Sequence, residues 1–372
     1  MIIYLLIAVL TAGMAAIVDN IDNRIVKAAL IALIVFVFCY FAGARDLTVG
    51  TDTGGYGYST FLGAKAYPLE TFLFGAYSGW GFLYKLVAWT SVNAFGTFGA
   101  MLFAIELCIV VPVIIVGYKY TNRHLALVTI LFALYFYPLS FNLIRQSMAM
   151  SFLLVAWYAL DRKRVFHFFV WLLVAALFHS SAILGLCLPV FYYIARPGRV
   201  PFRYKTLLFI VLSTLGLLLM PYALSAIAPY LPHYGAYVTE SNYAISGHGY
   251  RNTIEIAIAF ITIYLLCRIF AEQETQNCNN DVRLRVDELL VAVLFGVIVT
   301  GISTFSVYLG RVGTYFLYFA ILLIPIASDL IPGKAEQRFF AVVSIIVVAL
   351  LALDLFVITG QNEVVPYVFA TL

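Results

Sequence analysis

The stretch FFAVVSIIVVALLALDLFVIT, residues Phe339–Thr359, contains one charged side chain, Asp354, and neither proline nor glycine. A helix needs about 20 apolar residues to cross the hydrocarbon core of a bilayer, so this stretch predicts a membrane-spanning helix. Other continuous apolar stretches, such as Lys27–Tyr40, differ from the strands of a membrane barrel, which alternate in polarity. The fold class expected is therefore an all-α polytopic membrane protein.

The composition excludes several other classes of protein. Of the 372 residues, 64% are hydrophobic and 11% are charged, whereas about 25% of the residues of a soluble domain are charged. A net charge of +4 over this length provides no basic patch for nucleic acid, so no nucleic-acid partner is expected. The lipid bilayer itself is the expected environment.

About twelve membrane-spanning helices are expected from the apolar stretches. Two pairs, within 125–160 and within 167–195, are short for two spans, so a re-entrant or broken helix is the alternative there. Met1–Val18 lacks a basic segment and is expected to be the first span rather than a signal peptide. The expected spans are roughly 1–18, 25–43, 96–117, 125–141, 146–160, 167–179, 181–195, 206–221, 253–270, 289–307, 311–328 and 339–359.

The distribution of Lys and Arg predicts the orientation of the chain. Sixteen of the 22 basic residues fall in one set of loops, which we expect to face the cytoplasm, so that both termini face outward. We expect 1–372 to form a single transmembrane domain with a cytoplasmic loop at 271–288. Two longer periplasmic loops are expected at 44–95, with an interfacial helix anchored by Trp80, Tyr84 and Trp89, and at 221–252.

Four arginines lie on the outer side, against this charge bias: Arg45, Arg145, Arg251 and Arg311. Charged groups at the ends of spans are costly unless they are paired or line a watery cavity, and the planar guanidinium suits phosphate. The four arginines predict a pocket for an anionic headgroup such as a lipid-linked pyrophosphate. Two alternatives stay open, since Arg251 could pair with Glu255 one turn later and Arg45 could pair with its neighbours or cap its span.

Carboxylates and one histidine accompany these arginines. The segment Arg45–Tyr56, RDLTVGTDTGGY, forms a turn-rich loop that presents Asp46 and Asp52. Asp52 could act as a base, bind sugar hydroxyls or hold Arg45. His179 lies within an apolar stretch and is either a hydrogen-bonded core residue or a general base. No metal-ligand spacing and no nucleotide-binding loop occurs, so neither a metal nor a cofactor is expected.

Four motifs taken together resemble a known family. In order along the chain they are Arg45–Tyr56, Asn142–Ala149 (NLIRQSMA), Leu177–Ala182 (LFHSSA) and Gly310–Tyr315 (GRVGTY). This series resembles the EpsG-like branch of the Wzy-type polysaccharide polymerases from about residue 40 to residue 330. The resemblance implies a GT-C-like, metal-independent glycosyltransferase in the bacterial inner membrane, with its active site facing the periplasm.

The same resemblance implies the reaction and its partners. A growing glycan would be transferred from undecaprenyl pyrophosphate to a lipid-linked repeat unit, and a chain-length regulator protein would be the usual partner. The cations for the leaving pyrophosphate would come from the four outer-side arginines, and an inverting displacement needs a base, for which we expect His179 or Asp52. The side chains expected to bind sugar are Asp46, Tyr56, Gln146 and Tyr250, together with Tyr234, Tyr237 and Tyr243.

Three other functions compete with this hypothesis. A flippase for the same lipid-linked unit would distribute charges through a central cavity and often shows an internal repeat, which this sequence lacks. An O-antigen ligase would share the arginines and the histidine. A membrane acyltransferase would also carry an intramembrane histidine, but its donor would arrive from the cytoplasm. The sequence does not distinguish O-antigen, capsule and secreted exopolysaccharide as the product.

Overall fold

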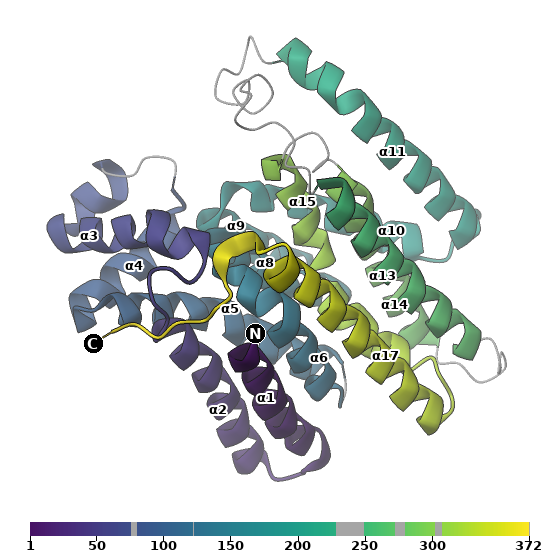
Figure 1. Ribbon diagram of the computed structural model, residues 1–372. Coiled ribbons are helices and arrows are strands. Elements are labelled where there is room, and N and C mark those ends of the chain that lie inside the picture. The colour runs from purple at the N-terminus through teal and green to yellow at the C-terminus, as the bar shows by residue number, and fades with distance from the viewer. Residues whose placement is uncertain (76–79, 122, 228–248, 272–279, 302–306, 372) are drawn as a thin grey trace. The chain divides into compact units, whose positions relative to one another are not determined.

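The computed structural model describes residues 1–75, 80–121, 123–227, 249–271, 280–301 and 307–371 (Figure 1). Within these residues the regular structure is helical, apart from one isolated antiparallel bridge between Arg45 and Phe369. The chain forms two compact units, one comprising Met1–Leu186 with Ile345–Leu372 and the other Cys187–Ser344. All-helical architecture is therefore confirmed for the described part of the chain.

The first unit contains most of the helices of the N-terminal half. Their bounds are α1 (Ile2–Asn20), α2 (Arg24–Gly43), η1 (Thr53–Gly57), α3 (Tyr58–Ala66), η2 (Thr71–Gly75), α4 (Phe82–Phe95), α5 (Phe98–Tyr120), α6 (Leu125–Leu131), η3 (Phe132–Phe136), α7 (Tyr137–Ser140), α8 (Ile144–Asp161), α9 (Val165–Phe178) and η4 (Ser180–Cys187). The C-terminal turns η8 (Asp354–Ile358) and η9 (Gln361–Glu363) belong to the same unit. In Figure 1, α1 and α2 lie side by side as a hairpin at the purple end of the chain.

The second unit is built from longer helices. Their bounds are α10 (Leu188–Ala195), α11 (Phe202–Ile227), α13 (Gly249–Ala271), α14 (Asn280–Thr300), α15 (Val307–Leu317) and α16 (Ala320–Ser328). Helix α17 (Lys334–Leu353) begins in this unit and ends in the first. Helices α11 and α14 extend into the predicted loops 221–252 and 271–288, because hydropathy detects only the apolar part of a helix.

Within the described residues, each of the twelve expected spans overlaps a helix or consecutive short helices. Six helices within the described residues are long and apolar enough to cross a membrane. They are Ile2–Asn20, Arg24–Gly43, Phe98–Tyr120, Arg251–Ala271, Gly310–Ser328 and Lys334–Ile358. The protein is therefore a membrane protein, whereas the number of twelve spans stays a prediction.

The helix is interrupted within residues 167–195, which are too few for a regular hairpin of two spans. Helix α9 ends at Phe178, His179 is extended with φ −150° and ψ 121°, and a tighter helical turn over Ser180–Cys187 follows. This interruption agrees with the broken-helix alternative for 167–195. It places His179 at a helix end instead of inside a continuous span.

Glycines allow close helix crossings in both units. A Cβ on Gly43 would come within 2.8 Å of the Gly99 carbonyl oxygen, so α2 and α5 meet backbone to backbone. In the second unit, a Cβ on Gly313 would lie 2.8 Å from the Gly296 carbonyl oxygen, where α14 meets α15. Small residues permit this approach between membrane helices.

The C-terminal segment, residues 360–370, packs against the loop that follows α2. The amides of Asp46 and Gly50 donate to the carbonyls of Val368 and Glu363 at 2.9 and 2.8 Å, and the Ala370 amide donates to the Ala44 carbonyl at 2.9 Å. The Tyr4 hydroxyl donates to the Val364 carbonyl at 2.8 Å, which brings the first turn of α1 to this segment. The first turn of α1 and the C-terminal segment therefore lie together within the first unit. That both termini face outward from the cytoplasm stays a prediction.

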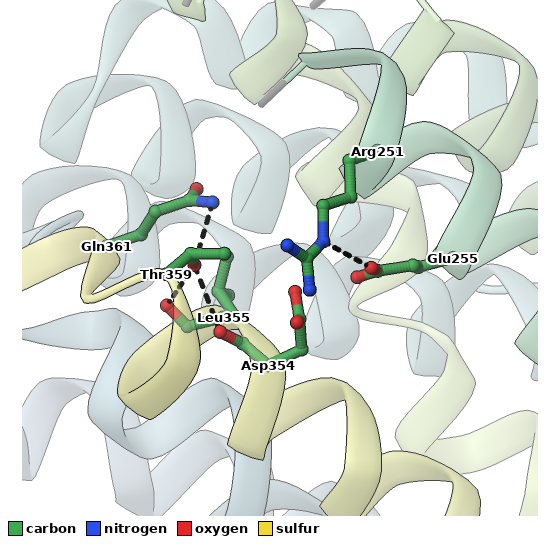
Figure 2. A network of polar contacts seen from close by, with 6 residues as sticks. All are labelled: Arg251, Glu255, Asp354, Leu355, Thr359 and Gln361. Atoms are coloured by element: carbon green, nitrogen blue, oxygen red, sulfur yellow. Dashed lines mark hydrogen bonds and ion pairs between the residues drawn. The ribbon is translucent and has the colours of Figure 1, made fainter. Parts of the chain in front are cut away.

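The turn before this segment is fixed by side-chain hydrogen bonds, which Figure 2 shows. The Thr359 hydroxyl contacts the carbonyl oxygens of Asp354 and Leu355, each at 3.0 Å, and the Gln361 amide donates to the Thr359 hydroxyl at 3.1 Å. Terminal carbonyls of a helix need such partners. These bonds end η8 and direct the chain toward the loop after α2.

Candidate active site

Asp52 sits at the amino-terminal end of α8. Leu143, the residue before the helix, provides no side-chain cap, and the Ile144 amide instead donates to Asp52 Oδ2 at 3.3 Å. A carboxylate is favoured at a helix amino terminus, where amide groups lack intrahelical partners. The Tyr56 hydroxyl donates to the same oxygen at 2.6 Å. The turn-rich loop is thereby joined to the helix that carries Arg145.

Arg145 lies against aromatic rings. Its guanidinium carbon is 4.6 Å from the centre of the Tyr56 ring and 5.4 Å from that of Trp80. The two rings meet edge to face at a centroid distance of 5.5 Å. Arg145 Nε is buried and has no hydrogen-bond partner among the described residues. Arg145 is therefore held by π faces, and its Nε donor is unoccupied within the part of the chain that the structure describes.

Tyr84 and Thr60 contact the residues that hold Arg145. Tyr84 is fully buried, and its hydroxyl is 3.0 Å from the Thr60 hydroxyl, which in turn contacts the Tyr56 carbonyl at 2.7 Å. The expectation that Tyr84 anchors an interfacial helix at headgroup level is wrong, because the ring packs inside the protein beside Tyr56 and Trp80. Helix α4 covers most of the stretch expected to form the interfacial helix, whose place at the membrane interface stays a prediction.

The Tyr56 hydroxyl donates a hydrogen bond to Asp52 and keeps its proton. Burial raises the pKa of Tyr56, and the nearby Asp52 carboxylate raises that pKa further. Burial likewise raises the pKa of Tyr84. Both phenols therefore stay neutral at physiological pH, and the Tyr56 hydroxyl serves as a hydrogen-bond donor.

His179 is brought to this region by a close backbone contact. A Cβ on Gly81 would lie 1.9 Å from the Phe178 carbonyl oxygen, so the residue after Trp80 packs directly on the end of α9. His179 is half-buried, and its Nδ1 is 2.7 Å from the Ser181 hydroxyl and 3.4 Å from the Ser181 amide nitrogen. The Ser181 amide donates to an unprotonated Nδ1, whereas the hydroxyl can either donate to Nδ1 or accept from Nδ1–H.

Arg45 and Asp46 have structural contacts at the base of the loop. The Arg45 side chain is 2% exposed, donates from Nη1 to the Ala42 carbonyl at 2.7 Å and from Nε to the Thr53 hydroxyl at 3.1 Å. Its guanidinium also lies 4.0 Å from the Phe141 ring centre. These contacts favour the alternative in which Arg45 caps the preceding span. Asp46 accepts from the Thr48 amide and hydroxyl, which lower the pKa of its carboxyl and close a tight turn.

Two further residues of the loop region are constrained by packing. Gly50 has φ +88°, and a Cβ there would come within 2.5 Å of the Phe141 carbonyl oxygen, so both backbone conformation and space require glycine. Gln146, expected to bind sugar, is 6% exposed on the buried side of α8. Asn142, just before that helix, donates to the Asn362 side chain of the C-terminal segment.

The remaining predicted site residues belong to the second unit. Arg251 Nε pairs with Glu255 Oε1 at 2.8 Å one helical turn later, as Figure 2 shows, so the alternative left open for this arginine is confirmed. Arg311 is half-buried in α15, two residues before Gly313. Tyr250 lies in the first turn of α13. The expected sugar-binding residues Tyr234, Tyr237 and Tyr243 lie outside the described residues.

The structure thus brings Asp52, Tyr56 and Arg145 into contact and places the end of α9 beside Trp80. Trp80 itself was missed as a member of this cluster, because an aromatic residue at the start of an amphipathic helix also fits the membrane interface. The signal available was the sequence Gly79-Trp80-Gly81, in which a ring is flanked by residues that permit close backbone packing. Within the described residues no group of three or more His, Cys, Asp or Glu side chains could hold a metal ion.

Comparison with known proteins places the chain in a family. The EpsG family profile matches residues 28–369, which is nearly the whole chain. No curated protein and no solved structure matched it. The four motifs that carry the resemblance lie inside the matched range. The chain therefore belongs to the EpsG family, whose members are membrane proteins with a polysaccharide-polymerase-like function.

Proposed function

We propose that this protein is an inverting, metal-independent polysaccharide polymerase. It transfers a growing glycan from undecaprenyl pyrophosphate to a lipid-linked repeat unit at the periplasmic face of the bacterial inner membrane. The observation that carries the proposal is Arg145, a cation that aromatic rings hold beside the carboxylate of Asp52. Membership of the EpsG family supports the same class of reaction.

The proposed chemistry is a direct displacement at the anomeric carbon of the donor. A hydroxyl oxygen of the acceptor sugar forms the new bond, the bond from the anomeric carbon to the pyrophosphate oxygen breaks, and the hydroxyl proton passes to a base. Negative charge develops on the departing undecaprenyl pyrophosphate, and a preorganised guanidinium stabilises that charge. Arg145 is assigned this role, with Arg311 and Arg251 as further candidates for binding the pyrophosphate.

His179 is our preferred base, and Asp52 is the group that binds the sugar or orients an arginine. For Nε2 to accept a proton, Nδ1 must carry one, and the Ser181 hydroxyl at 2.7 Å can accept a hydrogen bond from Nδ1–H once the Ser181 amide no longer donates to Nδ1. Asp52 Oδ2 already accepts hydrogen bonds from Tyr56 and from Ile144. This difference favours the histidine. Asp46, Gln146 and Tyr250 keep the weaker assignment of sugar binding.

A strain lacking this protein provides the test. Lipid-linked and surface polysaccharide are separated on gels, and a polymerase defect leaves a single repeat unit in place of the ladder. Loss of every repeat at the surface would instead support a flippase, and a full ladder retained on the lipid carrier would support a ligase. An unchanged ladder would contradict the proposal. A chain-length regulator is the proposed protein partner, and its removal should alter the ladder length without abolishing polymerisation.

Complementation with variants tests the residues. Arg145→Ala and His179→Ala, expressed at the wild-type level, should fail to restore the ladder. His167→Ala is the matched control, because His167 lies near the opposite end of α9. Restoration of a normal ladder by both site variants would show that the assigned residues do not carry the reaction.

A further inference from the structure

We infer that Tyr56 and Trp80 form an aromatic clamp that fixes the Arg145 guanidinium for a pyrophosphate-bearing lipid, and that the Tyr56 hydroxyl couples this clamp to Asp52. The inference rests on the proposed function and deepens it. It assigns positioning roles to two residues, one of which was expected to bind sugar and the other to anchor a helix in the headgroup layer.

The first argument concerns the charge of Arg145. An arginine oriented by a carboxylate has part of its charge neutralised and some of its N–H donors occupied. Tyr56 and Trp80 contact Arg145 through ring faces 4.6 and 5.4 Å away, which attract the cation without accepting its in-plane hydrogen bonds. Arg145 Nε has no hydrogen-bond partner among the described residues. The rings therefore hold the cation while leaving this in-plane donor unoccupied.

The second argument concerns connectivity. The Tyr56 ring contacts Arg145, its hydroxyl bonds Asp52, and Asp52 accepts from the amide of Ile144, which directly precedes Arg145. These four residues form a closed cycle of contacts between the loop and α8. A shift of the Tyr56 side chain therefore moves both charged groups. The ring and the hydroxyl of this one residue perform separable tasks.

The third argument concerns Trp80. Its neighbour Gly81 packs against the carbonyl of Phe178, immediately before His179. Trp80 also contacts Tyr56 and Tyr84, with ring centroids 5.5 and 6.2 Å away. The backbone next to Trp80 is thus held against the end of α9, while the indole itself packs on Tyr56 and Tyr84. Arg145 takes its orientation from a surface that also sets the position of His179.

Binding of undecaprenyl pyrophosphate to the purified full-length protein in detergent tests the clamp without knowledge of the sugars. Arg145→Ala should abolish measurable binding. Tyr56→Leu and Trp80→Ala, which remove one π face each, should weaken it about 3- to 30-fold. Tyr56→Phe retains the ring and should bind within about twofold of wild type, yet it should polymerise more slowly in cells because the Asp52 contact is lost.

Tyr58 provides the matched control. It lies two residues after Tyr56, stacks on Phe61 and meets Phe98 edge to face. Tyr58→Leu should bind undecaprenyl pyrophosphate as wild type does. Trp80→Phe, which retains a smaller ring, should recover most of the binding lost in Trp80→Ala, and this rescue distinguishes a π contact from a loss of folding.

The outcomes separate the clamp from the proposed function. A wild-type protein that does not bind undecaprenyl pyrophosphate would overturn the proposed function, and the clamp with it. Wild-type binding that is lost in Arg145→Ala but unchanged in Tyr56→Leu and Trp80→Ala would overturn the clamp alone. Equal weakening in Tyr56→Leu and Tyr58→Leu would show that the effect is one of general packing, which also contradicts the inference.

Discussion

At the scale of single residues, Arg145 shows why the shape of a cation matters as well as its charge. The guanidinium is planar, lies against two rings and offers several N–H donors in one plane. An ammonium group provides the same charge as a compact, strongly hydrated point. The position of Arg145 after the α8 amino terminus was recognisable from sequence, because a charged residue between apolar ones is conspicuous. Its aromatic partners were not, because tyrosine and tryptophan are common throughout membrane interfaces.

Arg145→Lys should therefore lose most of the polymerisation activity. A lysine cannot form the paired contacts with phosphate oxygens and stacks less well on Tyr56 and Trp80, so we expect at least about a tenfold loss. The measurement is the length distribution of lipid-linked glycan in complemented cells at equal expression. Wild-type ladders from the lysine variant would mean that charge alone is sufficient.

Gly50 makes a second prediction at this scale. Its φ of +88° and its contact with the Phe141 carbonyl oxygen both oppose any side chain. Gly50→Ala should destabilise the first unit by about 1–3 kcal/mol. Thermal denaturation of the detergent-solubilised protein measures this effect. Gly13→Ala is the control, because a Cβ at Gly13 meets nothing within 4 Å; equal melting temperatures for the two variants would contradict the argument.

At the scale of elements, helices were predictable and their contacts were less so. Each expected span coincides with helical residues, because long apolar stretches leave the backbone no other way to satisfy its hydrogen bonds in lipid. The break at His179 could be anticipated only from the short length of 167–195. The docking of residues 360–370 could not be anticipated, because it uses backbone groups that any sequence possesses.

The C-terminal segment, residues 360–370, should be required for activity of the site around Asp52 and Arg145. Deleting residues 361–372 removes the partners of the Asp46 and Gly50 amides and of the Tyr4 hydroxyl. We expect a chain that still inserts into the membrane, melts at a lower temperature and does not polymerise. Deleting only residues 371 and 372, which follow the last of these hydrogen bonds, is the control. Normal ladders from the longer deletion would disprove the requirement.

Gly81 tests the link between the loop and the end of α9. A methyl group there would overlap the Phe178 carbonyl oxygen, so Gly81→Ala must separate the Trp80 backbone from α9. We expect reduced polymerisation with membrane insertion unchanged, measured by ladder length and by the amount of protein in the membrane fraction. Gly75→Ala, where a Cβ would meet only the Thr71 methyl group at 3.6 Å, should be tolerated. Full activity in the Gly81 variant would contradict the proposed arrangement.

At the scale of the whole molecule, the family match over residues 28–369 covers both compact units. The predicted site residues are correspondingly divided, with Asp52, Tyr56, Arg145 and His179 in the first unit and the remaining arginines, Arg251 and Arg311, in the second. Sequence order revealed these motifs, because short charged segments stand out against apolar spans. It could not reveal that Arg45 is enclosed by Ala42, Thr53 and Phe141, since burial depends on long-range packing.

The arginine-based chemistry makes a prediction for the complete protein in its membrane. If guanidinium groups supply the positive charge for the leaving pyrophosphate, polymerisation in isolated membrane vesicles should be unchanged by EDTA. Incorporation of labelled repeat units into longer glycans provides the measurement. Loss of activity on chelation, with recovery on adding Mg²⁺ or Mn²⁺, would contradict a metal-independent mechanism.

The docked segment also has a consequence for biosynthesis. Residues 360–370, which include η9, leave the ribosome after all the other helices of the first unit, yet they supply backbone partners to the loop that contains Asp46 and Gly50. That loop therefore completes its hydrogen bonding only after α17 has been inserted. An interrupted translation product contains the arginines, the histidine and most of the helices but lacks the finished loop. Under the proposed function, a product that stops before residue 360 should therefore insert into the membrane without being able to polymerise glycan.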